Sequence, residues 1–158
     1  MNPIKARLLF YGAVLLVSTA AVAYTTAMPG RSFSGPLPEP TSELKLLEGR
    51  LRGHVNALAT DIGVRNWEHA AQLAAARDYI RSVLAPLESA EARTTLEDLG
   101  SAGQGGQNVV FEISGAEATS LLVVGAHYDS AHVSPGANDN ASGVAAALEL
   151  ARSLARAP

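Results

Sequence analysis

The sequence predicts an α/β domain that follows an apolar, membrane-type helix. The helix is indicated by a run without charge at residues 8–30 of the 158-residue chain. Apolar residues then recur at steps of three and four, which is typical of amphipathic helices. Further along, short apolar stretches bounded by glycine, asparagine or serine are typical of strands. Helices and strands in one domain place it in the α/β class.

The predicted N-terminal helix occupies residues 1–28. Lys5 and Arg7 precede the uncharged run, and about 20 apolar residues are enough to cross a bilayer as a helix. The tripeptide Ala21-Val22-Ala23 resembles a signal-peptidase site, so the segment is an uncleaved signal anchor, which we favour, or a cleaved secretory signal. In both cases the basic residues stay cytoplasmic and the domain is exported. A buried helix of a soluble protein is the least favoured interpretation.

A proline-rich stalk is predicted over residues 29–41, ahead of the domain formed by residues 42–158. Proline and glycine cannot continue a helix, and this composition favours extended, polyproline-like backbone. The prolines are Pro29, Pro36, Pro38 and Pro40.

Two amphipathic helices are predicted at the start of the domain. Thr41 is the expected N-cap of the first and Asn66 of the second, which Pro86 ends. Both apolar stripes are predicted to face the core. The stripes are Leu44, Leu47, Leu51, Val55 and Leu58 in the first helix, and Leu73, Ala76, Ile80 and Leu84 in the second. His54 and His69 fall on these helices, where we expect surface or helix-end positions.

Two strands are predicted next, over residues 94–99 and 108–114. The loop between them, residues 100–106, is too rich in glycine for a helix. It contains neither a GxGxxG nor a GxxxxGK[ST] pattern, so nucleotide binding has no support.

Composition excludes a further class of partner and limits the chemistry. The formal net charge is −3, with charges spread along the chain, so there is no basic stripe for nucleic acid. The chain has no cysteine and therefore offers neither a disulfide nor a thiolate ligand. Any metal site must be built from nitrogen and oxygen ligands.

A histidine and an aspartate follow a third predicted strand. The run Leu121-Leu122-Val123-Val124 predicts a buried strand of a parallel or mixed sheet. His127 and Asp129 then share one side of the extended chain, and Tyr128 points to the other. Since a metal-bound histidine usually donates its second ring N–H to a carboxylate, this spacing is typical of a metal ligand with its orienting partner.

Asp139 has two interpretations. A helix is predicted over residues 141–157, so Asp139 and Asn140 lie at or just before its start. Aspartate is favoured as an N-cap, where the helix dipole stabilises its charge. However, the loop between a strand end and a helix start is also where α/β sheets place ligands, and an aspartate there can bridge two metal ions. The spacing leaves both interpretations open.

Two motifs together carry a family resemblance. They are Gly125-Ala126-His127-Tyr128-Asp129-Ser130 and Gly136-Ala137-Asn138-Asp139-Asn140-Ala141-Ser142-Gly143. They closely resemble the co-catalytic zinc aminopeptidases, the metallopeptidase family that includes bacterial leucyl aminopeptidases, aminopeptidase Y and the glutamate carboxypeptidase type. Softer similarity covers residues 61–66, 75–80 and 107–115. The resemblance implies the N-terminal part of a three-layer α/β/α zinc exopeptidase domain with a mixed sheet.

The resemblance also implies roles for individual residues. His127 binds one zinc ion, Asp139 bridges the two zinc ions of a complete domain, and Asp129 orients His127 as the residue assigned to catalysis. The family's downstream acidic pair, further carboxylate and final histidine have no counterpart after Asp139, where Glu149 is the only carboxylate. Because zinc takes four ligands, we expect the N-terminal part of a longer enzyme, without appreciable peptidase activity in the chain alone.

The implied function is a zinc-dependent aminopeptidase that removes N-terminal residues from peptides. Its domain is expected outside the cytoplasm, anchored in the membrane or secreted. One alternative is a related zinc hydrolase, such as a carboxypeptidase, a deacylase or a cyclase. The other is a non-catalytic remnant or a binding ectodomain. His132, between the two motifs, is expected to be solvent-exposed, with substrate contact the lesser option.

Overall fold

The structure is a computed structural model that describes residues 2–27, 30, 32–100, 106–115 and 119–156. The chain divides into two compact units, Met1–Glu39 and Pro40–Pro158. Each unit is described by itself below.

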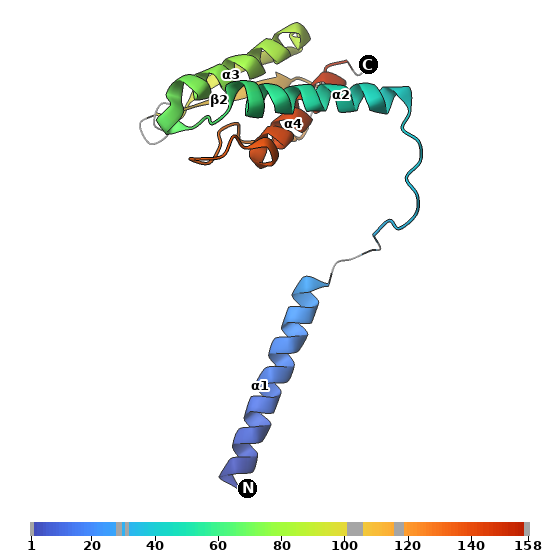
Figure 1. The fold of residues 1–158 in the computed structure, drawn as a ribbon, viewed down its shortest axis with the longest axis vertical. Helices are drawn as coiled ribbons and strands as arrows, with labels where there is room; N and C mark the ends of the chain where they lie inside the picture. Colours follow the sequence, from blue (N-terminus) through green and yellow to red (C-terminus); the bar gives the residue numbers. More distant parts are fainter. Residues whose placement is uncertain (1, 28–29, 31, 101–105, 116–118, 157–158) are drawn as a thin grey trace. The chain divides into compact units, whose positions relative to one another are not determined.

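The first unit contains one long helix, α1, Pro3–Thr26 (Figure 1). It begins after Asn2, whose side-chain oxygen accepts a hydrogen bond from the Ile4 amide at 3.0 Å. The helix is long and apolar enough to cross a membrane, with a mean hydropathy of 1.8 over 18 residues, and none of its residues is buried. A signal sequence has the same properties, so the predicted apolar helix is confirmed as a helix while anchor and signal both stay open. Residues 32–41, within the predicted stalk, form neither helix nor strand.

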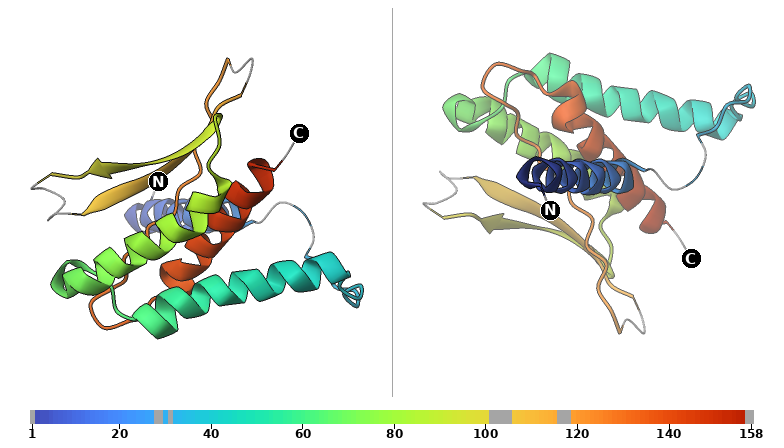
Figure 2. Two further views of the ribbon diagram at one scale, coloured as in Figure 1. Left: turned by 90° about the horizontal axis from the view of Figure 1, so that it is seen from above. Right: turned by 90° about the horizontal axis from the view of Figure 1, so that it is seen from below.

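The second unit contains three α-helices among its described residues: α2, Ser42–Asn56; α3, Ala70–Leu84; and α4, Ser142–Leu154. Figure 2 shows α4 lying between α2 and α3, in contact with both. Thr41 caps α2 as predicted, because its hydroxyl accepts a hydrogen bond from the Leu44 amide at 3.2 Å. Asn66 caps a short 3₁₀ helix, Trp67–His69, that leads directly into α3. The predicted end of the second helix before Pro86 is also confirmed.

A hairpin of two antiparallel strands packs beside α3: β1, Ala92–Asp98, and β2, Gln107–Ile113. The register pairs Ala92 with Ile113 and Asp98 with Gln107. Both strands lie within two residues of their predicted bounds, and the combination of helices with a small antiparallel sheet is compatible with the predicted α/β class. The three-layer arrangement and the mixed sheet stay predictions, because this hairpin is the sheet found in the described residues.

The core lies where the helices meet. Its buried apolar residues are Leu58, Ala59, Ala76, Ile80, Leu84, Leu87, Ala141, Val144 and Leu148. The α3 stripe is therefore buried largely as predicted. The stripe of the first helix is buried in part: Leu58, just after α2, is in the core and Val55 packs against it, whereas Leu44 is exposed.

The prediction of a surface position for His54 is wrong. His54 is buried, with Nδ1 2.7 Å from the Tyr79 hydroxyl and Nε2 3.2 Å from Glu149 Oε1. Glu149 also accepts hydrogen bonds from Arg50 at 2.6 Å and from Arg152 at 3.2 Å. A histidine inside a helix interface is tolerated because every polar partner it needs comes from the neighbouring helices. His69 does lie at a helix end, as predicted, between the 3₁₀ helix and α3.

The prediction of a buried strand over residues 121–124 is also wrong for this structure. The segment is not paired with any described strand, and its side chains are exposed, from 84% for Leu121 to 54% for Val124. Apolar side chains alone do not make a buried strand, since burial also needs neighbouring strands on both sides. The hairpin does not provide them.

We predict that Glu149→Ala destabilises the second unit by about 3 kcal/mol, because it leaves buried His54 and its arginine neighbours without their anion. Burial alone raises the pKa of Glu149, but hydrogen bonds from Arg50, His54 and Arg152 outweigh it, and the net pKa is lowered. Stability from Glu149 is thus present above its ordinary pKa of 4.5 and lost as the pH falls through the folded-state value. Urea unfolding followed by the fluorescence of Trp67, the single tryptophan, measures both effects.

The matched control is Glu48→Ala. Glu48 pairs with Arg52 one turn away on α2, and both side chains are largely exposed. An exposed helical pair contributes only about 0.3–0.5 kcal/mol. Equal losses in the two variants would contradict the role assigned to the buried cluster.

Candidate metal centre

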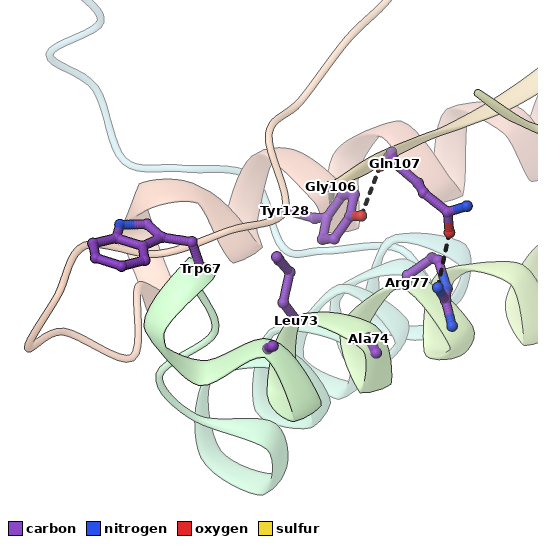
Figure 3. Close-up of a pocket in the computed structure, with 8 residues that line it drawn as sticks. Trp67, Leu73, Ala74, Arg77, Gly106, Gln107 and Tyr128 are labelled. Atoms are coloured by element: carbon purple, nitrogen blue, oxygen red, sulfur yellow. Dashed lines mark hydrogen bonds between the residues drawn. The ribbon is translucent and has the colours of Figure 1, made fainter. Parts of the chain in front are cut away.

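The two halves of the predicted zinc motif lie on an irregular loop and on the turn that follows it. Residues 119–136 form neither helix nor strand. The loop is fixed to the domain by Tyr128, which packs against the core and donates a hydrogen bond from its hydroxyl to the Gln107 carbonyl at 2.7 Å (Figure 3). His127 and Asp129 point the other way and are exposed. The predicted alternation along residues 127–129 is therefore confirmed, although the backbone is not part of a sheet.

His127 lies between two carboxylates. Its Nδ1 is 2.9 Å from Asp129 Oδ1, and its Nε2 is 2.9 Å from Asp139 Oδ1. The fold thus brings the three predicted site residues together. The hydrogen bond with Asp129 is the largest cause of a raised His127 pKa; slight burial opposes it, and Asp139 adds to it.

Asp139 does not cap helix α4. It lies in a short π-helical turn, Ala137–Ala141, and Asn140 at the next position accepts a hydrogen bond from the Gly143 amide at 3.2 Å. The capping oxygen at this helix start therefore belongs to Asn140. The Asp139 side chain is 81% exposed and is directed to His127.

Two glycines shape this turn. Gly136 has a φ of +60°, a backbone conformation that L side chains rarely adopt, and a Cβ there would collide with the Asp139 carbonyl oxygen. A Cβ at Gly143 would collide with the Asn140 side-chain oxygen. Close contacts therefore explain why both of these positions of the second motif are glycine, which the motif alone did not reveal.

Arg65 is the site residue that sequence reasoning missed. It is fully buried, and its guanidinium donates hydrogen bonds to the carbonyls of Leu58, Gly63, Tyr128, Pro135 and Gly136. Its backbone also pairs with Ser130, which donates its amide to the Arg65 carbonyl at 2.8 Å. Burial lowers the pKa of Arg65, and the charge of Asp129 partly offsets this. The sequence signal available was the similarity over residues 61–66, which gave no role to its arginine.

Other residues around the loop do not contact the His127–Asp139 pair, which is called the metal pair below. His132 is exposed, as predicted, with Nδ1 2.8 Å from Glu68 Oε2 and its ring edge-on to Trp67. A small pocket of about 70 Å³ lies between α3, β2 and Tyr128 (Figure 3). Neither His127 nor Asp139 lines it.

The donor types of the pair fit zinc. An imidazole nitrogen and a carboxylate oxygen are ordinary zinc ligands, and Asp129 on the second ring nitrogen is the usual orienting partner. Asp139 and His127 are both accessible to an ion from solvent. Within the described parts of the chain there is no group of three or more histidines, cysteines or carboxylates that could hold a metal ion. The pair therefore supplies two of the four positions of a tetrahedral zinc site.

Comparison with known proteins places this site in a family. Residues 108–158, which include the whole site, match the model of peptidase family M28. The chain is 32% identical over 145 residues to leupeptin-inactivating enzyme 1 of Streptomyces exfoliatus, covering 92% of this chain and 32% of that protein. It is 36% identical over 113 residues to the uncharacterized protein YfbL of Escherichia coli K12, covering 66% and 34%. An aminopeptidase of Pseudomonas aeruginosa is 50% identical over 50 residues, covering 32% and 9%.

The resemblance seen in the two motifs is thereby confirmed. The family match and the names of the relatives support the class of metallopeptidases. More particularly, the segment that carries His127, Asp129 and Asp139 matches the model of peptidase family M28. The chain spans about a third of the length of leupeptin-inactivating enzyme 1 and of YfbL. No solved structure gives a significant match.

We predict a pKa above 6.5 for His127 in the metal-free chain, because two carboxylates stabilise its imidazolium form. Asp129→Asn removes the larger cause and lowers the pKa toward its ordinary value. The small stability this provides is present below pH 6.5 and lost as the pH rises through the folded-state pKa. NMR titration of the His127 ring protons measures this pKa. A His127 pKa unchanged by Asp129→Asn would contradict the geometry.

We predict that Gly136→Ala separates Asp139 from His127, because the new Cβ displaces the Asp139 carbonyl and φ becomes strained. The cost is about 1–2 kcal/mol, typical of a non-glycine residue held in a left-handed conformation. Urea unfolding and the chemical shift of the His127 ring report the two effects. Gly53→Ala on α2, where a Cβ meets nothing, is the control and is expected to leave both unchanged or to raise stability slightly.

Proposed function

We propose that the protein carrying this site is a zinc-dependent aminopeptidase that removes N-terminal residues from peptides. One observation carries the proposal: His127 has a carboxylate on each ring nitrogen, one from its own loop and one from the start of α4. That arrangement is the one the family resemblance implies for a zinc ligand, its orienting aspartate and a bridging aspartate.

Each of the three site residues has its own role in this proposal. His127 Nε2 and the Asp139 carboxylate would hold the metal, and Asp129 would keep the proton on Nδ1 so that Nε2 is free to ligate. When bound, zinc ions polarise a scissile carbonyl and lower the pKa of a bound water. Because Asp139 is not needed as a helix cap, its carboxylate is available for the metal. Two zinc ions are expected per complete domain, with the remaining ligands and a general base supplied by groups other than these three.

The alternative functions predict different results in peptide assays and in zinc titration. A carboxypeptidase, deacylase or cyclase on the same scaffold differs in the substrate end it recognises, so assays with free-amine and N-blocked peptides separate it from an aminopeptidase. A non-catalytic binding role is favoured by the presence of only two ligands among the described residues. For that role we expect no saturable zinc binding.

We also propose the location and organisation of the protein. Residues 1–28 form a signal anchor, residues 29–41 a stalk, and residues 42–158 the peptidase part outside the cytoplasm. Helix α1 supports the anchor through its length and its uncharged run after Arg7. A cleaved signal gives a soluble, secreted product that begins after Ala23, and N-terminal sequencing of the mature protein separates the two.

We predict that His127→Ala or Asp139→Ala, introduced into the complete product of the native gene, lowers zinc-dependent release of N-terminal residues at least about a hundredfold, because each removes a zinc ligand. Hydrolysis of leucine p-nitroanilide measures the rate. His132→Ala is the matched control, since this exposed histidine lies on the same loop but outside the pair. Full activity in His127→Ala would contradict the proposed function. For the 158 residues alone, we expect no turnover.

A further inference from the structure

We propose that Arg65 is a positioning residue for the His127–Asp139 pair: it holds the loop at Tyr128, next to His127, and at Pro135 and Gly136, just before Asp139, so that the two side chains face each other. The inference rests on the proposed function for its purpose, but the clamp itself consists of contacts within this chain. Nothing in the family comparison assigns a role to this arginine.

The acceptors of the guanidinium lie on three segments. Nε donates to Tyr128 O at 2.6 Å, next to His127, while Nη1 and Nη2 donate to Pro135 O and Gly136 O, just before Asp139. A second group of bonds, to Leu58 O and Gly63 O at 3.1 Å each, ties the same side chain to the π-helical turn Ala57–Ile62 that follows α2 and to the residue after it. One planar group thus connects the middle of the loop, its end and the turn that follows α2.

The charge of this residue is not explained by an ion pair. Arg65 is fully buried, and among the described residues no carboxylate lies within salt-bridge distance of it. Burying an unpaired guanidinium is costly unless its donors are satisfied. An apolar side chain of similar size would fill the space at lower cost, but it would leave the five carbonyls without partners. The arginine is therefore suited to holding an irregular backbone rather than to filling the core.

Shape explains why lysine cannot replace it. Guanidinium presents five N–H donors in a rigid fork, whereas an ammonium is a point charge with three donors. Acceptors that span Tyr128 to Gly136 need the fork. The Gly136 carbonyl also accepts the Ala141 amide at 3.0 Å, so a shift there moves the turn that carries Asp139.

The first test is hydrogen exchange of the complete 158-residue chain in detergent micelles, without metal. In Arg65→Lys, we expect the amides of Ser130 and Ala141 to exchange about tenfold faster, from the loss of charge-assisted hydrogen bonds. The amides of Ala76 and Ile80 in α3 stay as slow as in the unchanged chain. The nuclear Overhauser contact between the His127 ring and the Asp139 β protons weakens. The matched control is Arg93→Lys, an exposed arginine of the hairpin paired with Glu112, which leaves all of these unchanged.

The second test is a zinc titration of the same chains, followed by the His127 ring signals. Loss of a residue that supports a metal ligand typically weakens metal binding about 10- to 100-fold. We expect at least tenfold weaker binding in Arg65→Lys and no change in Arg93→Lys. If the loop amides and the His127 to Asp139 contact are unchanged in Arg65→Lys, the clamp is overturned. If the loop loosens while zinc affinity stays equal, the positioning role is overturned.

These outcomes separate the two proposals. If zinc does not shift the His127 ring signals of the unchanged chain, the proposed function is wrong. The hydrogen-exchange and Overhauser data, which are recorded without metal, then still test whether Arg65 holds the loop. When Arg65→Lys loses the α3 protection, it has unfolded, and Ser130→Ala replaces it. That variant removes the hydroxyl that accepts the Arg65 amide at 3.1 Å and keeps the guanidinium. It is expected to speed exchange at the Arg65 amide and to weaken zinc binding; no effect on either counts against the clamp.

Discussion

Residues 119–136 contain no helix or strand, so their backbone groups cannot satisfy one another through a regular ladder. Arg65 provides hydrogen-bond donors from outside the loop, directed to carbonyls in its middle and at its end. A loop held in this way keeps the two sides of the metal pair at one separation, although neither lies on a regular element. The accessible pair therefore depends on a residue that has no access to solvent.

The second buried charge of the domain is satisfied in the opposite manner. Glu149 accepts hydrogen bonds from Arg50, His54 and Arg152, which come from α2 and from its own helix. Arg65 is thus surrounded by neutral carbonyls, whereas Glu149 is surrounded by basic side chains. The hydrogen bonds of Arg65 hold the loop, and those of Glu149 hold α2 and α4 together. The two helices thereby form a rigid support for the site.

Local patterns predicted the elements well where the determinant was local. The Thr41 cap, the helix end before Pro86 and the hairpin follow from the sequence itself. The surface assignment of His54 failed because its partners come from residues 79 and 149, which no helical period reveals. The grouping of His127, Asp129 and Asp139 followed from spacing and resemblance. The role of Arg65 could not be predicted, because its five acceptors are backbone carbonyls, which every residue type carries.

The exposed apolar segment at residues 121–124 has a consequence for handling the protein. Its side chains are leucine and valine, and no hydrogen bond joins its backbone to the rest of the described chain. An exposed stretch with high β propensity, no charge and no proline, and without backbone partners among the described residues, is a template for intermolecular strand pairing. In preparations of this chain alone, we therefore expect these four residues to favour self-association as the concentration rises.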